Sequence, residues 1–164
     1  MDMIFAEIEN TLRSNNYFSA ITTALLVPDI CGALGSNDGV ATGAKFRQWY
    51  DENLAAQYES LTAVDCYSLR CGVVHQGRFG GGRGQYARVL FTVPNAQNNT
   101  FHRIIINDCL NLDAIRFCTD VVNAGRHWFA QNQTDANVVA NLPRLVQFRP
   151  DGLPPYMIGM PLIA

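Results

Sequence analysis

The sequence predicts a mainly α-helical fold, a bundle of about five helices with one inserted β-hairpin, in a single domain over residues 1–164. Three observations predict it. Apolar residues recur every three or four positions in four segments of the N-terminal half. Segments 86–93 and 101–106 are rich in β-branched and aromatic residues and flank a turn-forming stretch, PNAQNNT. A last long segment of helical periodicity follows, so the bundle should cover residues 1–132 and leave a tail over 133–164.

The first two predicted helices cover residues 2–14 and 17–35. The first carries its apolar side chains on one face. The second is apolar on nearly every side, which is typical of a helix in the centre of a bundle. Pro28 should kink or divide the second helix, because proline lacks the backbone N–H, and Gly35 should end it.

The third helix is predicted over residues 42–58 and is amphipathic. A fourth helix should begin after Thr62, because Thr62 can act as an N-cap and Asp65 stands at the capping-box position three residues later. It should end at Gly77. The stretch RFGGGRG that follows is too rich in glycine for a helix or strand, so it predicts a flexible loop.

The last helix is predicted in LDAIRFCTDVVNAGRHWFAQN, with Asn107 or Asn111 as its N-cap. The tail from Thr134 onward contains five of the seven prolines. It should therefore be mostly irregular and lie over the surface of the helices.

The composition favours a protein that associates with itself. Hydrophobic residues make up 48% of the chain and charged residues 16%, whereas about 25% charged residues is usual in soluble domains. Apolar surface buried against a second copy of the chain would account for this difference, so we expect a homodimer. The formal net charge of −2 argues against nucleic acid wrapped over the whole surface, but it allows a local basic patch.

The cysteines and the N-terminal segment indicate a cytoplasmic protein. The chain has five cysteines and no CxxC pair, which favours reduced thiols over a disulfide framework or a zinc site. The first residues, MDMIFAEIEN, lack the basic and apolar regions of a secretory signal. The most apolar stretch is interrupted by Pro28 and Asp29 before it reaches the length of a membrane span. We therefore expect no membrane segment.

The predicted fourth helix carries a group of reactive and polar side chains in an otherwise apolar stretch. LRCGVVHQG brings together Arg70, Cys71, His75 and Gln76. It resembles the Arg-x4-His motif of HEPN domains, and in particular the LRCxxxHxG variant of small bacterial HEPN-like proteins. The resemblance covers about residues 1–132, with helices before and after the motif.

The resemblance implies an all-α bundle that dimerises around the motif helix. Many HEPN domains are metal-independent endoribonucleases of toxin–antitoxin, CRISPR or anti-phage systems. By this resemblance Arg70 and His75 are catalytic, RNA is the substrate, no cofactor is needed, and a cognate antitoxin or defence protein is a further partner. Other members bind nucleotide, RNA or protein without catalysis. Cys71 stands where active members most often carry Asn, Asp or His, so such a binding module is the alternative.

The two motif residues suit cleavage of RNA without a metal. A histidine can accept or donate a proton near neutral pH, and an arginine can bind phosphate oxygens through its planar fork. On an ideal helix, however, five positions amount to roughly 140° beyond one full turn, so Arg70 and His75 do not share a stripe. A two-fold dimer would bring the two residue types together, since Arg70 of each chain could contact His75 of the other. We therefore expect a composite site at the dimer seam.

Further residues are expected to support this site. Four arginines and no acid lie between Tyr67 and Arg88, so a basic loop could close on a phosphate backbone. The residues expected to bind substrate or support catalysis are Tyr67, Ser68, Cys71, Gln76, Arg78 and Arg83. Asp29 and Asp65 are expected to orient the site or to stabilise the helices. In the structural alternative, Arg70 and His75 tie their helix to one of these two carboxylates. His102 and His127 are expected to have packing or surface roles.

Overall fold

The computed structural model describes residues 1–79, 85–97 and 99–164, and it is mainly α-helical. Most of the predicted loop RFGGGRG, including Arg83, lies outside the described residues. The helices are α1 (Asp2–Arg13), α2 (Tyr17–Ala24), α3 (Val27–Leu34), α4 (Gly43–Asn53), α5 (Ala63–Gln76), α6 (Ala114–Asn132) and α7 (Ala136–Asn141), with short 3-10 turns at Ala55–Gln57 and Leu142–Arg144.

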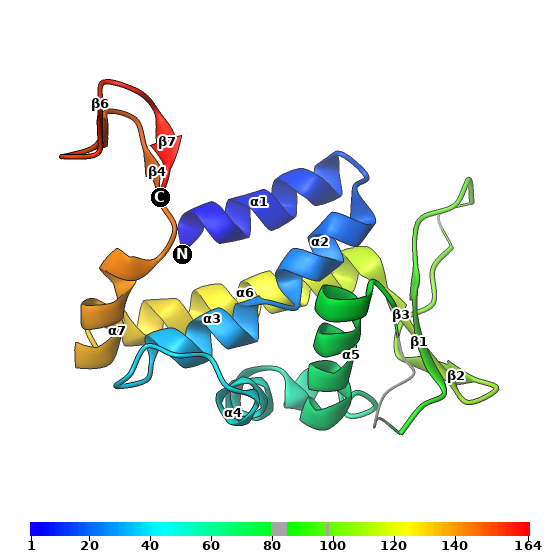
Figure 1. Cartoon of the computed structure of the whole chain (residues 1–164). Coiled ribbons are helices and arrows are strands. Elements are labelled where there is room, and N and C mark those ends of the chain that lie inside the picture. Colours follow the sequence, from blue (N-terminus) through cyan, green and yellow to red (C-terminus); the bar gives the residue numbers. More distant parts are fainter. Residues whose placement is uncertain (80–84, 98) are drawn as a thin grey trace.

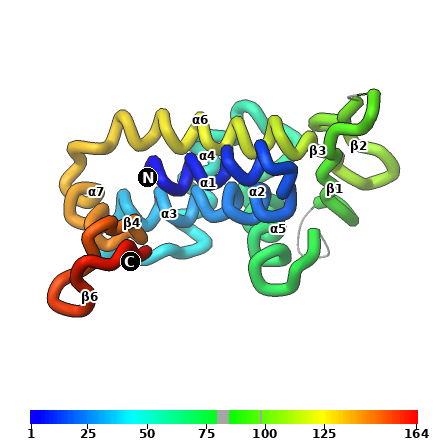
Figure 2. Tube along the Cα trace, turned by 90° about the horizontal axis from the view of Figure 1, so that it is seen from above, coloured from blue at the N-terminus to red at the C-terminus, as the bar shows by residue number. Residues whose placement is uncertain are grey.

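Helix α6 forms the axis of the molecule. Helices α1, α2, α3 and α4 all contact it, and a small sheet lies at one end while the C-terminal segment lies at the other (Figures 1 and 2). Its buried face includes Phe117, Val121 and Val122, which pack into a single core with residues of the other helices. Gly125 lets α1 approach closely, because a Cβ there would stand 2.7 Å from the ring of Phe5.

The predicted division of the second helix is confirmed. Helix α2 ends at Ala24 and α3 begins at Val27, so Pro28 lies in the first turn of α3, where a missing backbone N–H costs little. Gly35 is the C-cap residue of α3, as expected. By length and composition Tyr17–Leu34 also meets the criterion for a membrane-spanning helix, but half of it is buried inside the protein, and the core helix of a soluble protein meets the same criterion.

The predicted fourth helix is confirmed at both ends. Thr62 and Asp65 form the capping box of α5, and Gly77 ends the helix in the left-handed conformation with φ of 62°. The third helix is shorter than predicted: α4 ends at Asn53, and a 3-10 turn follows it.

The predicted β-hairpin is wrong in its pairing. Strand β3 (Cys109–Asp113) lies between β1 (Arg88–Thr92) and β2 (Ile104–Ile106), parallel to β1 and antiparallel to β2. The hairpin therefore joins β2 to β3. Asn107 and Asp108 form its turn, both with positive φ, and two such residues favour a tight two-residue turn.

The predicted cap of the last long helix is also wrong. Asn107 lies in the hairpin turn, and Asn111 lies within β3, where its amide donates to the carbonyl oxygens of Ile104 and Cys109. The side chain of Asp113 caps α6 instead, because it accepts a hydrogen bond of 2.8 Å from the backbone N–H of Arg116.

The tail contains more regular structure than predicted. Helix α7 packs on α3, and beyond it two small antiparallel pairs form an arm that projects away from the helices (Figure 1). These pairs are β4 (Phe148–Arg149) with β7 (Leu162–Ile163), and β5 (Gly152–Leu153) with β6 (Met157–Ile158). Tyr156, at the tip, is 84% exposed.

The five cysteines are free thiols, as expected. Cys31, Cys66 and Cys118 are buried in the core, and burial raises the pKa of the Cys118 thiol to about 12. Among the described residues no group of His, Cys, Asp and Glu side chains is arranged to hold a metal ion.

Candidate functional site

The fold brings the motif arginine on α5 to a buried carboxylate on α3. Arg70 Nε donates a hydrogen bond of 2.6 Å to Asp29 Oδ2, although 41 positions separate the two residues. Asp29 lies in the first turn of α3 and is only 7% exposed. Burial raises the pKa of the Asp29 carboxyl above its ordinary value, and the nearby guanidinium of Arg70 acts in the opposite direction. Of the two carboxylates considered from the sequence, Asp29 is the partner of Arg70.

The same guanidinium also reaches the motif histidine. Arg70 Nη1 lies 3.2 Å from His75 Nε2 within one chain. The long side chain of Arg70 therefore overcomes the angular separation of the two positions on the helix. A guanidinium has only donors, so His75 Nε2 is the acceptor and the ring proton lies on Nδ1. The result is a polar chain from Asp29 through Arg70 to His75, which ends at an exposed imidazole.

A stripe of α5 faces outward beside this polar chain. It includes Val64, Ser68, Cys71, Val74 and His75, at the spacing of one helix face. Val64 is 53% exposed and Val74 is 39% exposed, while Ser68 and Cys71 are half-buried. This stripe, called the outer face of α5 below, has an exposed valine near each end and carries no acidic residue.

Tyr67 joins α5 to α4 instead of reaching the outer face. Its ring packs against Phe46 at 5.2 Å between centroids, and the guanidinium of Arg47 lies 5.5 Å from its centre. Gly43 allows this approach, because a Cβ there would stand 2.7 Å from the ring. The neighbouring Cys71 thiol is the main cause that raises the pKa of the Tyr67 phenol, and burial adds to it. Tyr67 therefore belongs to the packing between α4 and α5.

Asp65 lies at the opposite end of α5 from the motif. Its Oδ2 accepts from the backbone N–H and the hydroxyl of Thr62, and its Oδ1 accepts a bond of 2.6 Å from the backbone N–H of Gln85. Asp65 is therefore a structural carboxylate that the fold does not bring to Arg70.

The structure brings none of the other predicted residues into a hydrogen bond with the described part of the polar chain. Gln76 is the exposed last residue of α5, Arg78 is exposed just past its end, and Arg83 lies outside the described residues. His102 has a packing role, as expected: its Nδ1 accepts from the backbone N–H of Asp113, and its ring meets Tyr58 edge to face. His127 is exposed on α6.

Aromatic packing holds the chain in place just after the motif. This packing was not predicted from the sequence. The ring of Phe79, two residues past Gly77, contacts Phe18 on α2 and Phe91 on β1. Phe18 is 54% exposed, so this contact leaves an accessible aromatic surface beside the end of α5. An exposed aromatic residue is hard to predict here, because Phe18 stands in a helix that is apolar on nearly every side.

The arrangement supplies a permanent cation and an imidazole in direct contact. The cation can bind a phosphate oxygen, and the imidazole can accept a proton once its Nε2 is released.

Searches against protein-family models, curated proteins and solved structures return no match for this chain.

Proposed function

We propose that this protein is a HEPN-type, metal-independent endoribonuclease that acts as a cytoplasmic homodimer in a toxin or anti-phage system. The observation that carries the proposal is the contact of 3.2 Å between Arg70 and His75, with Arg70 held by the carboxylate of Asp29. A fixed cation next to an exposed imidazole is the minimum that cleavage through the 2′-hydroxyl requires.

The reaction follows from the donors and acceptors of the two residues. A phosphate oxygen of the RNA takes the Nη1 donor of Arg70, which releases the Nε2 lone pair of His75. His75 then accepts the proton of the 2′-hydroxyl, and the 2′-oxygen forms a bond to phosphorus. Arg70 stabilises the charge on the phosphate oxygens while the bond to the 5′-oxygen breaks. The 5′-oxygen takes a proton from the His75 imidazole of the second copy, which has bound that proton from solvent and no longer accepts from its own Arg70. The products are a 2′,3′-cyclic phosphate and a 5′-hydroxyl, and the two histidines exchange roles in the next turnover.

The outer face of α5 supports a dimer seam next to this chemistry. Val64 and Val74 present apolar side chains to solvent on the same helix as the motif. Packing this face against a second copy would bury both valines and bring two Arg70–His75 pairs together around a two-fold axis. We expect Val74→Glu to convert the dimer to a monomer in light-scattering measurements. Val139→Glu on α7, a site of similar exposure, serves as the matched control.

The test of the proposed activity is cleavage of total RNA in EDTA, with the fragment ends mapped. We expect His75→Gln and Arg70→Lys each to lower the rate by about 10²-fold or more, since general acid–base catalysis contributes about 10²–10⁴-fold. His127→Gln and Arg13→Lys are matched controls at exposed positions outside the site. Cleavage that persists in His75→Gln, or that requires a divalent metal, would contradict the proposal.

A second candidate function is an RNA- or nucleotide-binding module without catalysis. The ion pair with Asp29 favours it, because the pair already engages one edge of the Arg70 guanidinium. In that case wild-type protein would leave RNA intact but bind it. Arg70→Lys would weaken this binding, and His75→Gln would change it much less.

A further inference from the structure

A pocket of about 300 Å³ lies between α3 and the C-terminal helical segment. It is lined by residues of α3, by Gly39 and Ala41 in the loop that follows α3, and by Asn141, Arg144 and Leu145. Its size is at the lower end of the range for small-molecule sites.

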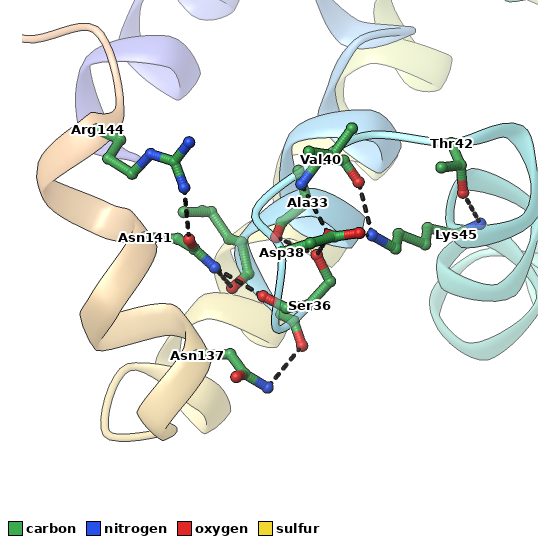
Figure 3. A network of polar contacts seen from close by, with 11 residues as sticks. Ala33, Ser36, Asp38, Val40, Thr42, Lys45, Asn137, Asn141 and Arg144 are labelled. Atoms are coloured by element: carbon green, nitrogen blue, oxygen red, sulfur yellow. Dashed lines mark hydrogen bonds and ion pairs between the residues drawn. The ribbon is translucent and has the colours of Figure 1, made fainter.

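The walls of this pocket are held in place by a polar network (Figure 3). The side-chain amide of Asn141 donates to the carbonyl oxygens of Leu34 and Ser36, at 3.1 and 2.7 Å, which fixes α7 against the end of α3. Asp38 accepts hydrogen bonds from Ser36, from the backbone N–H of Val40 and from Lys45, which fixes the loop. The pocket is therefore largely formed before any ligand binds.

Gly39 closes the loop against the C-terminal segment. Its φ is +66°, and a Cβ at this position would stand 2.5 Å from Asn141 Oδ1 and 2.7 Å from Arg144 Nη1. Only a glycine combines this backbone conformation with so close an approach. The approach brings the loop, Asn141 and Arg144 together on one side of the pocket.

The lining combines apolar side chains with two opposite charges. Ile30, Leu34 and Leu145 supply apolar surface, and the buried residue Asp29 belongs to the same lining. Arg144 is exposed, and its Nη1 donates to Asn141 Oδ1 at 3.3 Å. Among the described residues no carboxylate forms an ion pair with Arg144. Its remaining donors can therefore bind an acidic group of a ligand.

We propose that this pocket binds a small amphipathic acid. Its carboxylate or phosphate group binds Arg144, and its short apolar body packs on Ile30, Leu34 and Leu145. A hydrogen-bond donor at its other end, such as an amine or hydroxyl, binds Oδ1 of Asp29, because Oδ2 already accepts from Arg70. A buried carboxylate and an accessible guanidinium in one apolar pocket select a molecule with a donor and an acid over one with either group alone.

Three probes of matched length test this proposal: ε-aminocaproate, caproate and hexylamine. Each is titrated into the full-length labelled protein while methyl NMR signals of Ile30, Leu34 and Leu145 are followed. We expect ε-aminocaproate to bind most tightly, with a Kd on the order of millimolar, caproate to bind more weakly, and hexylamine to bind least. Hexylamine binding as tightly as caproate would overturn the assignment of an acid. If ε-aminocaproate binds no more tightly than caproate, the role of Asp29 is wrong.

Two variants locate the acid-binding residue. Arg144→Gln removes the charge at an exposed position and keeps an amide that can donate to Asn141, and we expect it to weaken caproate binding about tenfold. Arg13→Gln, at an exposed position on α1, is the matched control and should leave binding unchanged. Equal affinity of wild type and Arg144→Gln, or the absence of saturable binding by all three probes, would overturn the proposal.

Discussion

The two ends of α5 are built in opposite ways, although a buried aspartate serves each of them. At the N-terminal end, both carboxylate oxygens of Asp65 accept hydrogen bonds, from Thr62 and Gln85. At the C-terminal end, Asp29 holds Arg70, which contacts an exposed His75. The first end is closed and its polar groups are satisfied by the protein itself. The second end leaves the imidazole of His75 exposed beside a half-buried cation, and it is the end at which we propose the chemistry.

The largest effect on stability is expected at the closed end. Asp65→Ala removes the capping box and leaves the backbone N–H groups of Thr62 and Gln85 without their acceptor. Loss of a cap costs about 1 kcal/mol, and each buried donor left unsatisfied costs about 1–3 kcal/mol. We expect the free energy of unfolding to fall by about 3 kcal/mol in urea titrations at a fixed protein concentration. Asp51→Ala, an exposed acid on α4, should change it by less than about 0.5 kcal/mol.

If Asp65→Ala lowers the free energy of unfolding by less than about 1 kcal/mol, the proposed contrast between the two ends of α5 is wrong. It would mean that water replaces the carboxylate at little cost, and that the N-terminal end of α5 is not closed.

Breaking the ion pair between Arg70 and Asp29, at the C-terminal end of α5, should have the next largest effect on the free energy of unfolding. Arg70→Met leaves the Asp29 carboxylate buried without its cation, and we expect a loss of about 2 kcal/mol at neutral pH. This is less than the roughly 3–5 kcal/mol for a fully buried pair, because the side chains retain 18% and 10% exposure. The double variant Arg70→Met/Asp29→Leu should recover part of the loss, which a double-mutant cycle measures.

The pH dependence of this loss follows from the carboxyl of Asp29. Burial raises its pKa in the folded protein above the unfolded value of about 3.9. The folded state therefore binds the proton more readily, and its stability gains from protonation as pH falls through the folded pKa towards the unfolded one. Without Arg70 the pKa should rise further. The difference between wild type and Arg70→Met should therefore shrink as the pH is lowered. A difference that grows would show that Arg70 does not hold the pKa of the Asp29 carboxyl down.

The same comparison explains what the sequence could predict. The capping box of Asp65 and the end of α5 at Gly77 depend on residues three or four positions apart, and both were predicted. The partner of Arg70 lies 41 positions away, so the sequence alone left both Asp29 and Asp65 as candidates. In the sheet, segments 86–93 and 101–106 were paired because both are β-branched, whereas β3 separates them. Local sequence rules do not determine such non-local contacts. In CLNLD, apolar and polar residues alternate over only five positions, which is too few to distinguish a strand from the start of a helix.

A smaller effect is expected where α5 ends. Gly77 has φ of 62°, and nothing lies within 4 Å of the position of a Cβ. Gly77→Ala therefore changes only the backbone preference, with an expected cost of about 1 kcal/mol. Gly77→Asn is the matched variant, since asparagine tolerates this conformation better and should cost less. Equal stabilities of all three proteins in urea titrations would show that the helix end unwinds without penalty.

The smallest effect is expected for the residue on which the proposed chemistry depends. His75 is exposed, and its one side-chain contact in the described structure is with Arg70, which keeps its bond to Asp29 when His75 is replaced. His75→Gln should therefore change the free energy of unfolding by less than about 0.5 kcal/mol. If it instead stabilises the protein measurably, the imidazole is held at a cost to folding, as is common for residues kept for function. A loss above about 1 kcal/mol would place His75 with Asp65 among the structural residues of α5, and any effect of this variant on RNA would then follow from folding.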